Sequence, residues 1–438
     1  MTGRWSAPRR KRFVLVVAGE VLSQVGDSVY LVALTWLILT KSSPQILAVS
    51  LVCLVVPRGV LLLIGGALTD RFSARRVMLC SHLARAGLVA ALVASAATGT
   101  VQPWEFFAIS AAFGVADAFF LPASKTIIAT LVPADELVQA NAVTTFGEQV
   151  AGLIGPAFGG LLVAFYGPVP ALAVNAVTFL IAAATIVAAP RATWQPEQGT
   201  LTVRGTLAQI TEGIAYARAK PGVRVVLVIV SASTLSYSGL FGVALPGLAR
   251  TLPHSALALG LMLSAWGLGQ LLGAASASFT GLPNRWGVFI IAMAYAEAAT
   301  FVVLGFLPSV WVVVPLFVLL GFGVAYSSDV ALPAWIQTTT PEAMLGRVSS
   351  VIEMPRTIFE PISIIVMGVL VSIDVRLALI CAAVPMLVAA VALSASRSAR
   401  SMGGAISTGQ VGSPVVAQPP AVPDPVAPEQ AKCRQPIT

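Results

Sequence analysis

The sequence predicts an all-α integral membrane protein with twelve transmembrane helices. Hydrophobic residues make up 57% of the 438-residue chain and charged residues only 10%, with a mean hydropathy of +0.89. A soluble domain cannot bury so much apolar sequence, so lipid must be the main solvent. The apolar residues form runs that are each long enough to cross about 30 Å of hydrocarbon as a helix. The expected spans are 13–38, 45–68, 76–98, 106–130, 139–165, 169–189, 223–249, 256–279, 287–307, 310–335, 348–372 and 376–396.

The distribution of basic residues predicts the orientation of these spans. If the N-terminus lies in the cytoplasm, nineteen of the 26 Lys and Arg residues fall on the cytoplasmic side and three on the opposite side. Such an excess is typical of cytoplasmic loops. We therefore expect both termini in the cytoplasm and a multi-pass protein of a bacterial plasma membrane. The basic residues bracket apolar runs and form no block of their own, so we expect no binding of nucleic acid.

A polar stretch divides the spans into two sets of six. We expect a cytoplasmic N-terminal tail, an N-terminal six-helix bundle, a cytoplasmic linker that contains an amphipathic helix, a C-terminal six-helix bundle and a disordered cytoplasmic tail. The linker helix would place Leu207, Ile210, Ile214 and Ala217 on one face. The expected boundaries of the five segments are 1–12, 13–189, 190–222, 223–396 and 397–438.

The two sets of spans repeat one another. PADEL at 133–137 precedes the fifth span and PEAML at 341–345 precedes the eleventh. Glu148 and Pro156 have counterparts in Glu353 and Pro361, and both pairs are 205 residues apart. These matches indicate a duplicated six-helix unit, which is an architecture of many secondary transporters.

Two motifs carry a resemblance to a known family. GGALTDRFSARR at 65–76 resembles the signature between the second and third spans of the major facilitator superfamily, although Ser73 and Ala74 depart from it. GPAFGG at 155–160 resembles the fifth-helix motif of the antiporters of that superfamily. The matching positions are Gly66, Leu68, Asp70, Arg71 and Arg75 in the first motif, and Gly155, Pro156, Gly159 and Gly160 in the second.

The resemblance implies two pseudo-symmetric six-helix bundles that work by alternating access. It also implies that Asp70 belongs to a cytoplasmic gate, where it caps a helix or pairs with a base of the other half. The segments FFLPAS and EAMLGRVSSV are similar to the branch of drug, macrolide and siderophore exporters, which are proton antiporters.

The first span carries a polar stripe. Glu20, Ser23, Gln24, Asp27 and Tyr30 are spaced so that they share one helical face. An ionisable side chain in a span costs roughly 2.5–3.5 kcal/mol unless it meets water or a partner, so we expect the stripe to face a cavity. Asp27 lies near the midplane. It is the candidate for a proton carrier or for a contact to a cationic substrate, and a structural salt bridge is the alternative.

The spans contain more acids than bases. Some of the acids must therefore be protonated, or matched by substrate or by a proton. We expect Arg356 to neutralise Glu353 or Glu360, and Arg58 and Arg85 to pair with acids on neighbouring helices. Glu297 is expected to be structural. The other candidates for proton coupling or for the substrate cavity are Asp117, Glu148 and Asp329.

Together, these features predict proton-coupled efflux of a small amphiphilic compound, such as a drug, an antibiotic or a siderophore. The alternative within the same fold is an importer or uniporter of a small metabolite. An integral-membrane enzyme is disfavoured because the two histidines and four scattered cysteines form no catalytic or metal-binding pattern, and a membrane scaffold has no need of buried acids. We expect no cofactor besides the proton gradient as energy source, no metal, and a monomer whose partners are a small-molecule substrate and the lipid bilayer.

Overall fold

The computed structural model describes residues 7–71, 73–133, 136–188, 211–212, 214–280, 285–307 and 309–402. These residues form helices and no strand. Twelve segments among them are long and apolar enough to cross a membrane, and each matches a predicted span to within several residues. The predicted all-α membrane fold is therefore confirmed.

The N-terminal bundle consists of six continuous helices. Three of them begin with proline, which suits a helix start because its missing N–H would have no intrahelical partner there. The fifth ends at Gly167, whose φ of 84° lies in the left-handed region that glycine tolerates best. The helices are α1 (Ala7–Lys41), α2 (Pro44–Arg71), α3 (Ala74–Ala97), α4 (Pro103–Leu131), α5 (Leu137–Tyr166) and α6 (Pro168–Ala188).

The C-terminal bundle differs in that two of its spans contain a π-helical segment. The first span comprises α8 (Pro221–Gly239), η2 (Leu240–Ala244) and α9 (Leu245–Ala249), and the fourth comprises α12 (Val310–Val324), η3 (Ala325–Ala331) and α13 (Leu332–Thr339). π-helical turns are rare and occur often at functional sites. The remaining elements are α10 (Ser255–Thr280), α11 (Trp286–Phe306), α14 (Glu342–Ile373), α15 (Val375–Ala395) and the short α16 (Arg397–Arg400).

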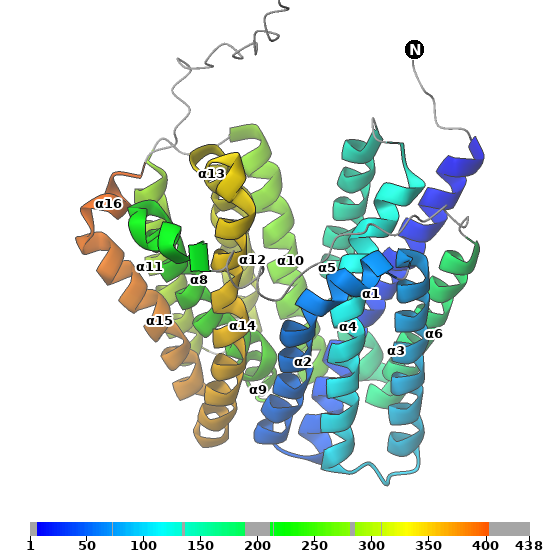
Figure 1. The fold of residues 1–438 in the computed structure, drawn as a ribbon. Helices are drawn as coiled ribbons and strands as arrows, with labels where there is room; N and C mark the ends of the chain where they lie inside the picture. The colour runs from blue at the N-terminus through cyan, green and yellow to red at the C-terminus, as the bar shows by residue number, and fades with distance from the viewer. Residues whose placement is uncertain are drawn as a thin grey trace, which may run out of the picture.

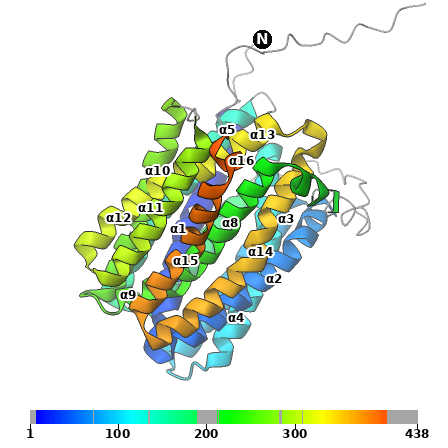
Figure 2. The ribbon, with the colours of Figure 1, turned by 90° about the vertical axis from the view of Figure 1, so that its left-hand side faces the viewer.

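The two bundles lie side by side and touch along two seams. Helices α1 to α6, coloured blue to teal, form one half of the molecule, and the green to orange helices form the other (Figure 1). The C-terminal bundle faces the viewer in Figure 2. Across the interface α5 packs against α10 and α2 packs against α14. These pairs are equivalent under the predicted duplication, because the fifth and eleventh spans correspond, as do the second and eighth.

Small residues let the helices approach closely at the seams. A Cβ added to Gly160 of α5 would lie 3.1 Å from the Gly260 Cα atom of α10, and one added to Gly59 of α2 would lie 2.9 Å from the Thr357 side chain of α14. At Gly368 an added Cβ would contact the Ala48 side chain. Such close approach favours packing of helices in lipid. The Gly160 and Gly368 contacts fall in the halves of the helices that lead to loops 42–43, 167 and 250–254, and the Gly59 contact lies near mid-helix. The bundles diverge toward the end where the N-terminus lies (Figure 1).

The glycines of the fifth-helix motif contact two different helices. Gly155 and Gly159 face α1, where an added Cβ would lie 2.6 Å from the Ser28 Cβ atom and 3.0 Å from the Val29 Cα atom respectively. Gly160 alone of the three faces α10. The motif therefore joins α5 to its own bundle and also to the opposite one.

Outside the predicted spans, the chain is ordered further than expected at its C-terminal end. Residues 397–402, predicted to begin a disordered tail, form α16 and a turn. Ala399 and Met402 are buried, and the Gly287 N–H donates a hydrogen bond of 2.9 Å to the Met402 carbonyl oxygen. The predicted boundary at 397 is thus too early, because apolar side chains anchor this segment. Ile214 and Ala217 of the linker pack on the core, whereas Leu207 and Ile210 lie outside the described residues.

Candidate functional site

The predicted polar stripe of α1 faces the interior of the N-terminal bundle. Glycines on another side of α1 allow α6 to approach closely, since a Cβ at Gly19 would touch the Thr185 side chain and one at Gly26 would touch Thr178. This packing turns the stripe toward α3 and α4. Ser23 and Tyr30 are buried, and the Tyr30 ring stacks on Phe113 of α4 at 4.6 Å.

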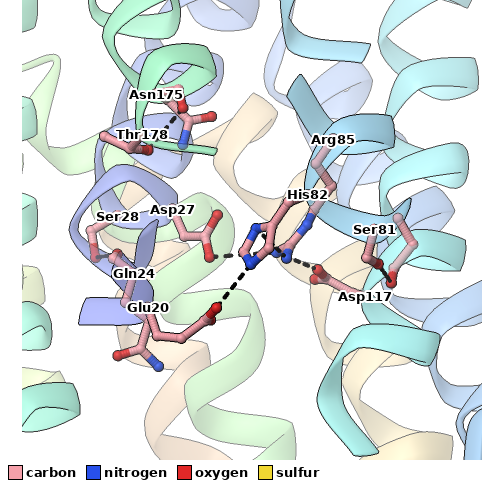
Figure 3. A network of polar contacts seen from close by, with 11 residues as sticks. Glu20, Gln24, Asp27, Ser28, Ser81, His82, Arg85, Asp117, Asn175 and Thr178 are labelled. Atoms are coloured by element: carbon pink, nitrogen blue, oxygen red, sulfur yellow. Dashed lines mark hydrogen bonds and ion pairs between the residues drawn. The ribbon is translucent and has the colours of Figure 1, made fainter. Parts of the chain in front are cut away.

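A chain of polar contacts links the stripe to α3 and α4 (Figure 3). His82 Nε2 lies 3.0 Å from Glu20 Oε1, and His82 Nδ1 lies 3.3 Å from a guanidinium nitrogen of Arg85. Arg85 then pairs with Asp117 at 3.2 Å and approaches Asp27 at 3.7 Å. Glu20, Asp27, His82, Arg85 and Asp117 are called the buried charge network below.

Aromatic rings hold the centre of the network away from solvent. The Arg85 side chain is 1% exposed, and its guanidinium lies 4.1 Å from the ring centre of Phe120 and 4.7 Å from that of Phe179. His82 is fully buried against the same two rings. Rings at these distances stabilise the cation and exclude water.

The network holds more acid than base. Three carboxylates face one guanidinium and one imidazole. With a neutral imidazole the network carries two excess negative charges, so it becomes neutral only when it binds protons or a cationic ligand. The prediction that Arg85 pairs with acids on neighbouring helices is confirmed.

The expectation that the stripe faces a cavity stays a prediction, and the side chains of Glu20 and Asp27 are 18% and 36% exposed. The central cavity lies between the bundles and has a volume of about 710 Å³. From α1 it is lined by Ser28 and Leu31, which lie one helical turn after Gln24 and Asp27 of the stripe. Bases of α3 are partners for two acids of the stripe, because His82 contacts Glu20 and Arg85 approaches Asp27. Apolar and aromatic side chains, among them Tyr237, Phe241 and Trp266, form much of the cavity wall.

Charged residues gather where the central cavity meets a seam. Arg58 of α2 and Glu360 of α14 form an ion pair of 3.3 Å between the bundles. On α14 Arg356 pairs with Glu353 at 3.2 Å, in a more exposed position. These contacts confirm the predicted partners of Arg58 and Arg356.

Other predicted residues lie apart from these two groups. Arg75 donates hydrogen bonds of 3.0 Å and 2.7 Å to the Ile186 and Val187 carbonyl oxygens, so it secures the C-terminal end of α6. Glu148 is exposed on α5 and belongs to no ion pair among the described residues. The side chains of Gly66, Leu68, Asp70, Arg71 and Asp329 lie outside the part of the chain that the structure describes.

Sequence reasoning missed the part that His82 plays. A single histidine in an apolar run gives no periodic signal, and the available hint was its spacing of three residues from Arg85 on one helical face. In the described ranges no three His, Cys, Asp or Glu side chains group as ligands for a metal ion.

Comparison with known proteins places this geometry in a family. The family profile described as "transmembrane secretion effector" matches residues 2–418. The multidrug efflux pump Tap of Mycolicibacterium fortuitum is 27% identical over 371 residues, which cover 82% of this chain and 89% of that protein. The enterobactin exporter EntS of Shigella flexneri is 26% identical over 293 residues, which cover 66% of this chain and 67% of that protein.

Solved structures share the fold at low sequence identity. The nucleoside transporter NupG superposes with a TM-score of 0.69 at 14% identity, over 88% of this chain and 98% of that one. A bacterial homologue of the iron transporter ferroportin, in an inward-facing state, gives a TM-score of 0.64 at 15% identity, over 88% and 98% of the two chains. The profile match spans nearly the whole chain, and it agrees with the helix count, the paired bundles and the central cavity. The chain therefore belongs to the transmembrane secretion effector family of the major facilitator superfamily, a family of membrane transporters.

Proposed function

We propose that the protein exports a small amphiphilic compound in exchange for protons, and that the buried charge network is the site where protons are bound and released. The observation that carries this proposal is the excess of three carboxylates over one guanidinium around a fully buried histidine. A purely structural ion pair would need equal charges, whereas this network becomes neutral only when it binds protons or a cationic ligand.

The geometry around Asp27 supports coupling between the network and the central cavity. Asp27 approaches Arg85 within the bundle, whereas the next residue, Ser28, lines the cavity and packs against Gly155 of α5. A change of charge at Asp27 therefore acts on α1, the helix that also packs against the seam helix α5. Several buried polar atoms of the stripe have no protein partner, so they would bind water that can carry protons to the network. These atoms are Ser23 Oγ, Gln24 Oε1 and Asp27 Oδ1.

The central cavity supports an amphiphilic substrate. Its volume of about 710 Å³ is within the range of drug-sized pockets, and its wall combines aromatic rings with the charged side chains of Arg58, Arg356 and Glu360. Tap and EntS are named as exporters, which supports efflux over import. The excess of basic residues in the loops and tails on the side of the N-terminus supports a plasma-membrane protein with both termini in the cytoplasm. The bundles diverge toward the end where the N-terminus lies, so the cavity would open inward (Figure 1).

Transport by purified protein in liposomes tests the proposal. A panel of dyes, macrolides and siderophores is presented to proteoliposomes with and without a pH gradient, using the wild type, Asp27→Asn and the control Glu105→Gln. Glu105 belongs to the capping box of α4, and glutamine is also favoured at that position. We expect a panel compound to move against its gradient only when protons flow the other way, with loss of this movement in Asp27→Asn alone. Equal pH-driven transport by Asp27→Asn would contradict the role of the network.

A further inference from the structure

A further buried acid lies in the C-terminal bundle, far along the chain from the buried charge network. Glu297 of α11 is 6% exposed, and its Oε2 atom has no hydrogen-bond partner. Among the described residues it forms no ion pair with Lys, Arg or His. An isolated buried carboxylate is costly in its charged form, so something must neutralise it.

The surroundings of Glu297 are polar although they lack a base. The Tyr237 hydroxyl of α8 is buried and lies close enough to the carboxylate to donate a hydrogen bond to it. Ser327 and Ser328 of η3 and Ser233 of α8 line the same small chamber. From α15 the chamber wall is Met386, which is not titratable. Among the described side chains of these elements, Tyr237 is thus the one titratable group that faces Glu297. The side chain of Asp329 lies outside the described residues.

The chamber is small and adjoins the central cavity. It has a volume of about 20 Å³, which admits a water molecule but no larger compound. Four residues line both the chamber and the central cavity: Ile229, Ser233, Ser328 and Leu332. The hydroxyls of Ser233 and Ser328 therefore stand at the partition between Glu297 and the space where a substrate would bind.

We propose that Glu297 is a second proton-binding site, which exchanges its proton with the central cavity through the Ser233 and Ser328 partition. A hydronium ion arriving from the cavity gives its proton to a carboxylate oxygen, so that a neutral carboxylic acid and a water molecule result. Water fits the volume of the chamber, and the serine hydroxyls supply both a donor and an acceptor for it. The site lies beside η3, a π-helical segment. This part of the span is therefore a candidate for rearrangement when Glu297 binds or releases its proton.

This inference depends on the proposed proton coupling only where it implies that transport uses the Glu297 proton. Binding of the proton to Glu297 can be measured without a substrate. Infrared difference spectra between high and low pH detect the carbonyl stretch of a protonated carboxylic acid. We expect Glu297→Gln to lose one such band relative to the wild type, and Glu105→Gln to keep it. Tyr237→Phe should keep the band and move it to higher frequency, because a hydroxyl that donates to the carbonyl oxygen lowers that frequency.

Further variants and a sodium addition distinguish a proton site at Glu297 from the alternatives. Asp27→Asn should retain the Glu297 band, so failure of the proton network and failure of this site give different results. A Ser328→Val variant, which narrows the partition, should slow exchange of the acid proton for deuterium. If Glu297→Gln folds poorly, the Tyr237→Phe shift still identifies the band. Unchanged spectra in both Glu297→Gln and Tyr237→Phe would overturn the proposal, as would loss of the band on adding sodium at constant pH, which would indicate a sodium site.

Discussion

Replacing Arg85 by methionine removes the positive charge at the centre of the buried network. Methionine keeps the apolar stem of the side chain, so the change acts mainly on charge. Asp117 at 3.2 Å and Asp27 at 3.7 Å then lose their counter-ion. The three acids of the network then remain with the His82 imidazole as their one basic partner among the described residues.

The expected loss of stability follows from these contacts. Removing one partner of a fully buried ion pair costs about 3–5 kcal/mol. Asp117 and Asp27 keep 20% and 36% of their side-chain exposure, so we expect the lower end, about 3 kcal/mol, with about 1 kcal/mol more from the lost contacts to Phe120 and Phe179. Asp117→Asn in the same chain should restore about 2 kcal/mol, because it removes one uncompensated charge.

Unfolding of the purified protein in mixed detergent micelles, followed by tryptophan fluorescence, measures these free energies. Arg75→Met is a matched control, since Arg75 also lies on α3 but binds carbonyl groups at the exposed end of α6. It should cost only about 1 kcal/mol. The reasoning is refuted if Arg85→Met is no more destabilising than Arg75→Met. It is also refuted if the Asp117→Asn change adds to the loss instead of reversing part of it.

Three further predictions concern the seams and the C-terminal segment. Gly160→Val should destabilise the protein by about 1–3 kcal/mol and impair transport, because the added side chain meets the backbone of α10, whereas Gly87→Ala, with open space around it, should do neither in melting and transport assays. Arg58→Ala should shift the equilibrium toward separation of α2 and α14 by roughly two- to tenfold, since a partly exposed pair contributes about 0.5–1.4 kcal/mol. Spin-label distances across this seam measure the shift, and reversing the pair with Arg58→Glu and Glu360→Arg should cancel it. Met402→Ala should lower the unfolding free energy by about 2 kcal/mol, whereas the exposed Ser401→Ala should leave it unchanged within error.

The spans and the ion pairs of this protein could be predicted because lipid imposes strict conditions. A helix in hydrocarbon needs a long apolar run, and an arginine inside one needs an acid nearby. These conditions were sufficient to place the spans and to assign acidic partners to Arg58, Arg85 and Arg356. The repeat of Glu148 and Pro156 as Glu353 and Pro361 also predicted the duplicated bundles, because the two pairs lie at equivalent positions of α5 and α14.

The orientation of the polar stripe could not be predicted in the same way. Helical periodicity shows which residues share a face but does not show which neighbour that face meets. Here Gly19 and Gly26 bring α6 against one side of α1, and the stripe is left facing α3. The π-helical segments η2 and η3 gave no recognisable signal, and Glu297 was expected to be structural because α11 is peripheral in the superfamily. Its side chain nevertheless points to a chamber beside the central cavity.

The most direct test of proton coupling through the buried charge network is the release of protons when substrate binds. Purified protein in weakly buffered detergent solution receives a compound that the liposome panel has identified, and a pH-sensitive dye records the protons set free. We predict that the wild type and Glu105→Gln release protons on binding and that Asp27→Asn and Glu20→Gln release fewer. Equal release by all four proteins would contradict the account, because the excess carboxylates of the network would then have no part in the exchange.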